Sequence, residues 1–512
     1  MLNNLKSKII FKTYTPNQIL LFPASLEEKI DQNHPVRIVN TVIERINIDS
    51  LIRKYKGGGS SSYHPRMMLK VLVYAYLVNL YHSRKIEAAL KENIYFMWLA
   101  GMNQPDHNTI NRFRSERLKD VLKEVFGQVV KLLTDQGLVS LQEIYLDGTK
   151  IQANANRYSF VWGGAVNRSR HRIEEQLKEL WAYTQRVAAE ELNDTEPIQF
   201  EQIDAQKVGD AIRRIDQALQ GKPIPRQIRK KIQYAKRCWP KNMAKNEQKG
   251  RILGQRRSYS KTDPDATFMP MKEDPKGKGQ LKAGYNFQIS TSDQFILNYS
   301  VHQNTNDINT LKPHIEEFKA LYHQTPQSLC TDAGYGSEEN YAYLEKEGIE
   351  NFVKYYLFDK EQIKAIKNDP FRIDNLFYNE GKDIVYCPIG QPMTRTEEHT
   401  VYSETGFVQQ QIRYQAQNCN GCPMRGPCFK GKGNRTIAIN PKLRKYKRKV
   451  RENLLSEQGL KHRKKRVVDV EPVFAFIKHN KGFRRFNLRG LEKVKVEVGL
   501  LAIANNLSKI VA

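Results

Sequence analysis

The sequence predicts a mixed α/β fold, in which a mixed sheet is flanked by helices and follows an all-α N-terminal region. Two observations support this prediction. From residue 65 to about residue 133 the apolar residues recur at helical spacing. After residue 140, short apolar strand segments alternate with helical segments, which is typical of an α/β domain.

The element order after residue 140 narrows the fold further. An apolar strand, 141–146, leads into Asp147, and two strand segments around a short polar turn at 292–294 predict a β-hairpin. A helix, a strand that ends before Asp332, another helix and a further strand follow. Three antiparallel strands, then a helix and a fourth strand, is the element order of the RNase H-like fold. We therefore predict an RNase H-like mixed sheet.

The charge balance indicates the kind of partner. Lys and Arg number 83 against 55 Asp and Glu, a formal net charge of +28, which points to nucleic acid or an acidic membrane surface. No apolar run approaches the roughly 18 residues that span a bilayer, and the first residues contain no apolar signal-peptide core. We expect a cytoplasmic protein that binds nucleic acid and no membrane.

The chain of 512 residues has room for several domains. We predict a helical, helix-turn-helix-like DNA-binding domain over residues 1–135, although a plain helical bundle fits the spacing equally well. An RNase H-like catalytic domain is predicted over residues 140–512. Two inserts interrupt it: a basic helical insert at 165–257 and a cysteine-rich, irregular insert at 360–440.

Two aspartates stand where an α/β sheet commonly holds its ligand. Asp147 and Asp332 come at or just past strand ends, and each is followed closely by glycine. An aspartate after a strand is also common in turns, so each one alone carries little weight. Asp263 and Asp265 are rival candidates, which we interpret as turn residues because no apolar strand leads directly into them.

Glu471 is the third acidic candidate. It opens a helical segment, with Pro472 in the first turn, and Lys478 lies seven residues on, two turns along the same face. A carboxylate for a metal and a lysine for a phosphate thus share one face. The alternative is an ordinary glutamate that is favoured by the positive end of the helix.

These motifs, taken in order, resemble a known protein family. Asp147-Gly-Thr, Thr331-Asp332-Ala-Gly-Tyr, and Val470-Glu471 followed by Lys478 and GFRRFNLRGLEKVKVE are similar to the transposases of bacterial insertion sequences. The resemblance is to the branch with a DDE triad in an RNase H-like domain and a cysteine-bearing segment before the final Glu. HPRMMLKVLVYAYL and PDHNTINRFR resemble its N-terminal domain, so the resemblance covers roughly residues 15–510.

The resemblance implies an activity and a cofactor. In this family the two aspartates and the glutamate hold the catalytic metals, so Asp147, Asp332 and Glu471 are expected to bind two Mg²⁺ ions, or Mn²⁺. Two such ions, roughly 3.5–4 Å apart, activate the entering oxygen and stabilise the leaving one in a displacement at phosphorus. Carboxylates suit Mg²⁺, which prefers oxygen ligands.

One departure from the family concerns an arginine. Related transposases often carry a Tyr-x2-Arg-x3-Glu-x6-Lys pattern, and Glu471 and Lys478 fit its second half. The position expected to hold the arginine, residue 467, is Val. Arg463 and Arg466 are the alternative candidates for its role.

Candidate DNA contacts lie in the helical region, in two basic runs and near the C-terminus. The run 225–257 has 12 Lys and Arg against one Glu, and the run 441–466 has 12 against two. A charge run usually just faces water, but the size and single sign of these runs favour phosphate contact. The candidates are Arg112, Arg114, Lys230, Lys231, Arg463, Arg466, Arg484 and Arg485.

Four of the six cysteines lie in one stretch, as a lone Cys followed by C-x2-C-x5-C. Four thiolates can form a tetrahedral zinc site, whose role would be structural because no ligand position stays open. The alternative is four reduced thiols in a loop. The predicted Zn²⁺ ligands are Cys387, Cys419, Cys422 and Cys428.

The sequence therefore predicts a DNA transposase that binds the terminal inverted repeats of its insertion sequence, cleaves the DNA and joins it to target double-stranded DNA. The resemblance implies a homodimer or larger assembly on DNA, in the nucleoid of a bacterial cytoplasm. Two alternatives stay open: a catalytically inactive or domesticated DNA-binding protein, and an RNase H-like nuclease without strand transfer. The intact acidic residues argue against the first alternative.

Overall fold

The computed structural model of the chain describes residues 25–55, 62–192, 200, 203–271 and 280–511. The N-terminal segment expected to contain no signal peptide, 1–24, and part of the linker after residue 55 lie outside the described residues. Among the helices of the described ranges, none combines the length and the hydropathy that crossing a membrane requires.

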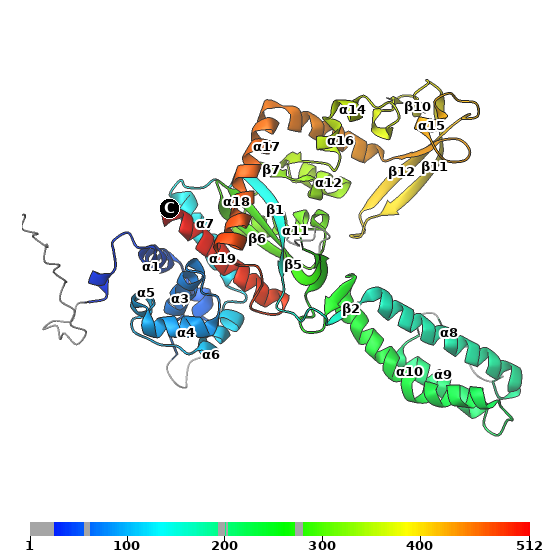
Figure 1. Cartoon of the computed structure of the whole chain (residues 1–512), viewed down its shortest axis with the longest axis horizontal. Helices are drawn as coiled ribbons and strands as arrows, with labels where there is room; N and C mark the ends of the chain where they lie inside the picture. The colour runs from blue at the N-terminus through cyan, green and yellow to red at the C-terminus, as the bar shows by residue number, and fades with distance from the viewer. Residues whose placement is uncertain (1–24, 56–61, 193–199, 201–202, 272–279, 512) are drawn as a thin grey trace, which may run out of the picture.

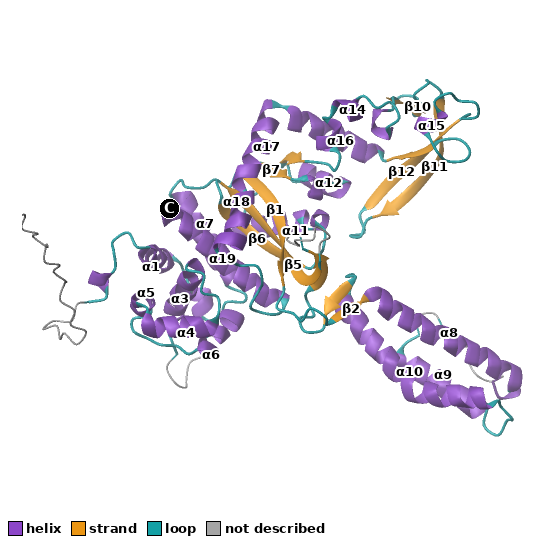
Figure 2. Cartoon of the chain, in the orientation of Figure 1, coloured by secondary structure: helices purple, strands orange, loops and turns teal. Residues whose placement is uncertain are grey.

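A mixed sheet of six strands lies at the centre of the molecule (Figures 1 and 2). β1 pairs antiparallel with β5 on one side and parallel with β7 on the other. β4 and β6 continue the sheet beyond β5, and β8 pairs parallel with β7. This arrangement confirms the predicted α/β class and is consistent with an RNase H-like core. The strands are β1 (Glu143–Gln152), β4 (Thr267–Pro270), β5 (Leu281–Ser292), β6 (Phe295–His302), β7 (Ser328–Thr331) and β8 (Glu350–Val353).

The β5–β6 hairpin closes through a two-residue turn, within the turn that the sequence predicts. Asp293 and Gln294 both have positive φ, 50° and 66°, as a type I′ turn requires. The carboxylate of Asp469 accepts hydrogen bonds from the N–H groups of both turn residues, at 2.7 and 3.2 Å. Asp469 ends α17 (Glu457–Asp469), so this contact holds α17 against the sheet.

One hydrophobic core joins the N-terminal helices to the sheet. α3 (Pro65–Leu77) and α7 (Leu122–Asp135) pack against α19 (Leu491–Val511), which also packs on β6. The predicted boundary at residues 135–140 therefore does not separate two cores. The other N-terminal elements are η1 (Glu27–Lys29), α1 (Pro35–Arg45), α2 (Asp49–Ile52), α4 (Ser83–Glu92), α5 (Ile94–Leu99), α6 (His107–Arg112) and the π-helical turn η2 (Phe113–Arg117).

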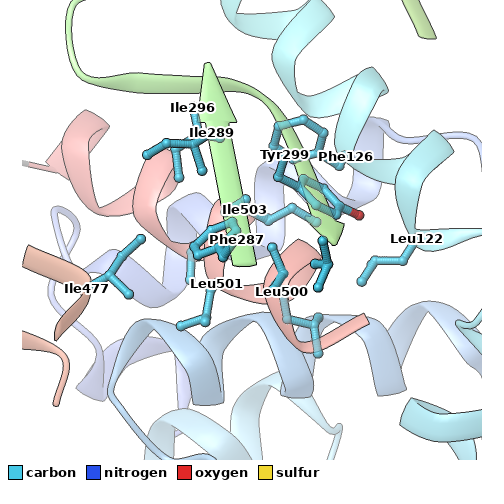
Figure 3. Packing of buried hydrophobic residues seen from close by; sticks show 14 of the residues in the cluster. Leu122, Phe126, Phe287, Ile289, Ile296, Tyr299, Ile477, Leu500, Leu501 and Ile503 are labelled. Carbon is cyan, nitrogen blue, oxygen red and sulfur yellow. The ribbon is translucent and has the colours of Figure 1, made fainter. Parts of the chain in front are cut away.

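The packing of this core is seen in Figure 3. Phe126 of α7 meets Tyr299 of β6 edge to face, with ring centroids 5.0 Å apart. Leu500 of α19 belongs to the same cluster and, like Phe126, is fully buried. Side chains from the two ends of the chain and from the sheet thus fill one interior.

Three helices form an arm with a hydrophobic core of its own, seen at the lower right of Figure 1. Its buried residues include Leu177, Ile215 and Trp239, one from each helix. At its base, the Gly163 N–H donates to the Arg257 carbonyl at 2.9 Å, so the chain enters and leaves the arm at one place. The arm corresponds to the basic helical insert. Its elements are β2 (Phe160–Trp162), α8 (Gly163–Val187), η3 (Glu190–Leu192), α9 (Ala205–Ala218), α10 (Arg226–Leu253) and β3 (Ser258–Ser260).

The cysteine-bearing segment is more ordered than the sequence suggests. We expected an irregular insert at 360–440, but it contains a five-stranded antiparallel sheet around Met393 and Tyr414. Its long β11–β12 hairpin is largely solvent-exposed on β11, which weakens the alternation from which strands are predicted. The strands are β9 (Tyr378–Asn379), β10 (Ile384–Tyr386), β11 (Pro392–Tyr402), β12 (Val408–Ala416) and β13 (Thr436–Ile439).

The remaining elements surround the central sheet and lead back to it. After the second sheet the chain returns through α16, α17 and α18, and a π-helical turn, η7, continues α18. These elements are η4 (Asp307–Asn309), α11 (Leu311–Tyr322), η5 (Ala333–Tyr335), α12 (Glu338–Lys346), α13 (Phe358–Glu361), α14 (Lys364–Lys367), η6 (Ile373–Asn375), α15 (Arg425–Cys428), α16 (Pro441–Leu455), α18 (Glu471–Ala475) and η7 (Phe476–Asn480).

Candidate active site

Asp147 and Asp332 lie on neighbouring strands. Leu146 of β1 is in register with Thr331 of β7, so the two aspartates follow paired residues on parallel strands. β7 ends at this point, whereas β1 continues to Gln152. We expected β1 to end at Asp147, but β5 pairs with it along its whole second half and extends it.

Arg466 links Asp147 to Glu471. Its Nη1 lies 3.2 Å from Oδ2 of Asp147, and its Nη2 lies 3.5 Å from Oε1 of Glu471. The Arg466 side chain is only 12% exposed, which strengthens both ion pairs relative to a surface pair. Among the two arginines that the sequence left open, Arg466 is the one beside the candidate carboxylates.

Arg463 takes a different place. Its guanidinium lies over the ring of Phe358, 5.2 Å from the centroid, in a cation–π contact. It is half-buried one turn earlier on α17. This position gives Arg463 a packing contact away from the carboxylate pair that Arg466 holds.

A buried polar network lies beneath the two aspartates and was not found from the sequence. The Tyr335 hydroxyl donates to the side-chain carbonyl of Gln288, and the Gln288 amide donates to Asp307 at 2.9 Å. Asn286 also donates to Asp307, at 2.7 Å. Asn286 and Gln288 are two residues apart on β5, so both point to the same face of the sheet. Both are fully buried. Two amide side chains that alternate with the large apolar residues 285, 287 and 289 are the signal that could have found them.

The Tyr335 hydroxyl is influenced by several acidic groups. Burial raises its pKa well above the ordinary value, and the negative charges of Asp307, Asp147 and Asp332 raise the pKa further. Arg466 lowers it. The charges of three carboxylates, and of the arginine that pairs with Asp147, therefore all affect the pKa of this hydroxyl.

Lys478 does not stand on a straight continuation of the Glu471 helix. α18 ends at Ala475, and the next five residues form the π-helical turn η7, which is wider than an α-turn. The expected alignment two α-turns along one face is therefore altered. Lys478 is half-buried, and its main-chain carbonyl accepts a hydrogen bond from Arg484 at 3.3 Å.

The rival aspartates hold the C-terminal segment in place. Asp263 is fully buried and accepts hydrogen bonds from the Tyr285 hydroxyl at 2.9 Å and from the Gly490 N–H at 3.1 Å. Asp265 accepts from the Leu491 N–H at 2.9 Å. Both carboxylates thus anchor the start of α19 through main-chain donors.

The acidic side chains suit a hard cation by their chemistry. They supply carboxylate oxygens, the ligands that Mg²⁺ and Mn²⁺ accept. In this structure the positive charge beside Asp147 and Glu471 is the guanidinium of Arg466. Within the described ranges, however, no three His, Cys, Asp or Glu side chains lie close enough together to hold a metal ion. Asp147 and Glu471 instead lie on either side of the Arg466 guanidinium.

The described residues give no support to the predicted zinc site, since no three of the four cysteines lie close enough together to hold a metal ion. Arg435 donates from Nη1 to the Cys428 sulfur at 3.0 Å and from its main-chain N–H to the Cys419 sulfur at 3.3 Å. The positive charge of a guanidinium this close to the sulfurs would repel a zinc ion. In the part of the chain that the structure describes, the cysteines belong to no cluster of three or more possible metal ligands. Cys387 and Cys419 pack against the core of the second sheet. The second sheet thus has a small apolar core of its own.

The candidate DNA contacts fall into two groups in the N-terminal region. Arg112, at the end of α6, has a side chain 72% exposed, 3.9 Å from Glu116. Arg114 is only 2% exposed and donates to the Tyr76 hydroxyl and the Tyr81 carbonyl, at 3.2 and 2.7 Å. This burial argues against the predicted DNA contact of Arg114 and gives it a structural role.

The other basic candidates lie on the arm and beside the C-terminal turn. Lys230 and Lys231 are on α10, and Lys231 pairs with Glu179 of α8 at 2.9 Å. Arg485 donates to the main chain after β1, at the Ala153 and Ala155 carbonyls. Arg484 lines a cleft of about 800 Å³ that α4 and the turn at 482–488 form together.

Two comparisons with protein families match the chain. The model described as Transposase DDE domain matches residues 386–511, and the model described as Transposase domain (DUF772) matches residues 24–116. The two matches indicate an insertion-sequence transposase of the DDE type. No curated protein and no solved structure matches the chain.

The matched ranges cover different parts of the site. The DDE match contains Glu471, Arg466 and Lys478, whereas Asp147 and Asp332 lie before it. Geometry connects the two aspartates with the matched segment: Asp147 pairs with Arg466, and Asp332 follows the strand that is paired with β1.

Proposed function

We propose that this transposase binds the ends of its insertion sequence, cleaves the DNA there and joins it to a target by two-metal phosphodiester chemistry. The observation that carries this proposal is the Arg466 bridge between Asp147 and Glu471, beside Asp332 at the next strand end. Arg466 pairs with acidic groups from distant parts of the chain, and Asp332 directly follows the strand that is paired with β1.

Asp147, Asp332 and Glu471 would hold two divalent ions, Mg²⁺ or Mn²⁺. Such ions, when bound, activate the attacking oxygen and stabilise the leaving oxygen at phosphorus. Glu471 has a side chain 51% exposed, so it can approach the aspartates by a change of side-chain rotamer. Arg466 offsets the repulsion between Asp147 and Glu471 in the protein alone.

Basic residues around the site would hold the DNA backbone. The cleft beside Arg484 is also lined by Arg84 and Lys85 of α4, so cations from both ends of the chain face one space. Phosphate oxygens accept hydrogen bonds from such side chains, and this contact does not depend on base sequence. Lys478, close to Arg484 along the chain, would add charge stabilisation near the reacting phosphate.

Recognition of the terminal repeats is proposed for the helical region 65–133, where Arg112 is exposed. The basic face of α10, including Lys230 and Lys231, would add phosphate contacts away from the site. Because two DNA ends must be joined to one target, the active form is proposed to be a homodimer or larger assembly on DNA.

The deciding experiment uses the full chain, Mg²⁺ and DNA that ends in the inverted repeats flanking the gene. The expected product is terminal DNA joined covalently to a target plasmid, absent when Asp147→Asn or Asp332→Asn replaces the wild type. Both variants should still retard terminal DNA in EDTA. Cleavage without joined product would favour a nuclease, and binding without cleavage would favour a DNA-binding protein.

A further inference from the structure

Asp307 lies next to the site although it is distant from the triad in sequence. It begins η4, between β6 and α11. Both carboxylates lie beside Gly334, two residues after Asp332. A Cβ on Gly334 would stand 3.1 Å from Oδ1 of Asp332 and 3.6 Å from Oδ2 of Asp307.

The Asp307 carboxylate is held by one oxygen. Asn286 and Gln288 both donate to its Oδ1, at 2.7 and 2.9 Å. Oδ2 is the oxygen on the side of Gly334 and Asp332. Two amide donors on one oxygen fix the orientation of the carboxylate, so that its second oxygen stays on the side of Gly334.

The main chain of β1 leaves room for this arrangement. A Cβ on Gly148, the residue after Asp147, would stand 2.1 Å from Nε2 of Gln288. Any side chain at position 148 would therefore displace the amide that holds Asp307. Gln288 also accepts from the Tyr335 hydroxyl, so the same amide links Asp307 to the loop after Asp332.

A purely structural explanation does not require the carboxylate. The start of α11 is fixed by the main-chain carbonyl of Asp307, which accepts from the Thr310 N–H at 2.9 Å and from the Thr310 hydroxyl at 2.7 Å. Burying three polar side chains to orient one acid is costly compared with apolar residues of similar size. The network therefore points to a task for the acid itself.

We propose that Asp307 is a fourth carboxylate of the active site, which helps Asp332 to hold the divalent ion. This inference rests on the proposed function, since it concerns the same metal site. Gln288 and Asn286 are then positioning residues that act through Asp307, and Gly148 is required for their approach.

The test measures Mn²⁺ binding to the full chain without DNA, by electron paramagnetic resonance of the free ion. Asp307→Asn keeps the shape and an oxygen that can accept from both amides, but removes the charge. We expect Mn²⁺ affinity to fall roughly 10- to 100-fold, the range seen when groups that support a metal site are removed. The melting temperature in EDTA should stay unchanged, and Asp307→Glu should restore part of the affinity.

Three further variants make the outcomes distinct. Glu316→Gln on α11, where the carboxylate accepts from Tyr343 at 2.7 Å, is the matched control and should bind Mn²⁺ like the wild type. Asp147→Asn and Asp332→Asn should bind it weakly. If these two bind normally, the proposed metal site itself fails. If they bind weakly but Asp307→Asn binds normally, or if Asp307→Asn melts much earlier in EDTA, Asp307 is structural and the inference is overturned.

Discussion

At the scale of single residues, Arg466 determines how the candidate site is held before any ion binds. Asp147 and Glu471 are separated by more than three hundred residues, and their like charges repel at short range. A guanidinium has a planar fork of donors and can meet two carboxylates at once, which an ammonium group does less well. The low exposure of Arg466 makes this pairing stronger than an exposed ion pair.

Arg466→Lys should slow the Mg²⁺-dependent cleavage of terminal DNA because one of the two contacts is lost. A hydrogen bond to a charged group contributes about 1.5–3 kcal/mol, which corresponds to roughly a 10- to 100-fold slower reaction. Single-turnover cleavage measures this. Arg463→Lys is the matched control, since Arg463 packs on Phe358, and it should retain most of the rate. Equal rates for both variants would contradict the role of Arg466.

At the scale of elements, the arm is built as a separable unit. Its helices have their own core, and its two ends meet at the Gly163–Arg257 hydrogen bond of 2.9 Å. α8, α9 and α10 therefore pack against one another and not against the core of the central sheet. The long helix α10 of the arm is rich in Lys and Arg, and the arm extends away from the central sheet (Figure 1).

Replacing residues 164–253 by a short Gly-Ser turn should leave the sheet folded and weaken DNA binding. The slope of log affinity against log salt should become shallower by about 0.9 for each phosphate contact that is lost. Titrations of terminal DNA at several salt concentrations measure the slope, and circular dichroism checks the fold. An unchanged slope would show that the arm does not contact DNA.

The junction of β6 with α11 should make stability depend on pH. The Ser300 hydroxyl shares hydrogen bonds with His302 and His314, at 2.7 and 2.6 Å. Burial lowers the pKa of His302 to about 4 and that of His314 well below its ordinary value. Both histidines are therefore neutral in the folded protein, whereas in the unfolded chain they gain protons below about pH 6.5.

Because the folded pKa lies below the unfolded one, this contribution to stability is complete above pH 6.5 and is lost as the pH falls toward 4. The loss from His302 amounts to about 3 kcal/mol across this interval. Urea unfolding at pH 7.5, 6 and 5 measures it. His302→Asn should show a flatter dependence than the wild type, and an identical dependence would contradict the assignment to this histidine.

At the scale of the whole molecule, the two ends of the chain are folded together. α3 is buried along most of its length and packs on α19, the last helix. The Tyr76 hydroxyl of α3 donates to Glu497 of α19 at 3.1 Å, and both residues are fully buried. The helical region proposed to bind DNA therefore shares one core with the sheet that carries the candidate site.

A fragment of residues 25–138 should not fold cooperatively, because the face of α3 that α19 covers would be exposed to water. Thermal unfolding followed by circular dichroism should be broad for the fragment and sharp for the full chain. A sharp transition of the fragment would mean that the predicted boundary near residue 135 separates an independent domain.

The sequence by itself determined the features that depend on local patterns. Strand and helix spacing predicted the central hairpin and the order of elements in the sheet, and the position of Asp147 and Asp332 after apolar strands singled them out. Charge runs predicted the basic arm. These signals survive in the structure because periodicity and charge are read over a few neighbouring residues.

Only the tertiary structure decided which residues act together. Arg466, and not Arg463, lies beside the candidate carboxylates, and Arg114 is buried. Arg435 contacts the cysteine sulfurs. Gln288 holds Asp307 near the loop that follows Asp332. Each of these outcomes depends on contacts between segments far apart in the chain. Such contacts are set by how helices and strands pack around a common core, and a local pattern carries no information on that packing.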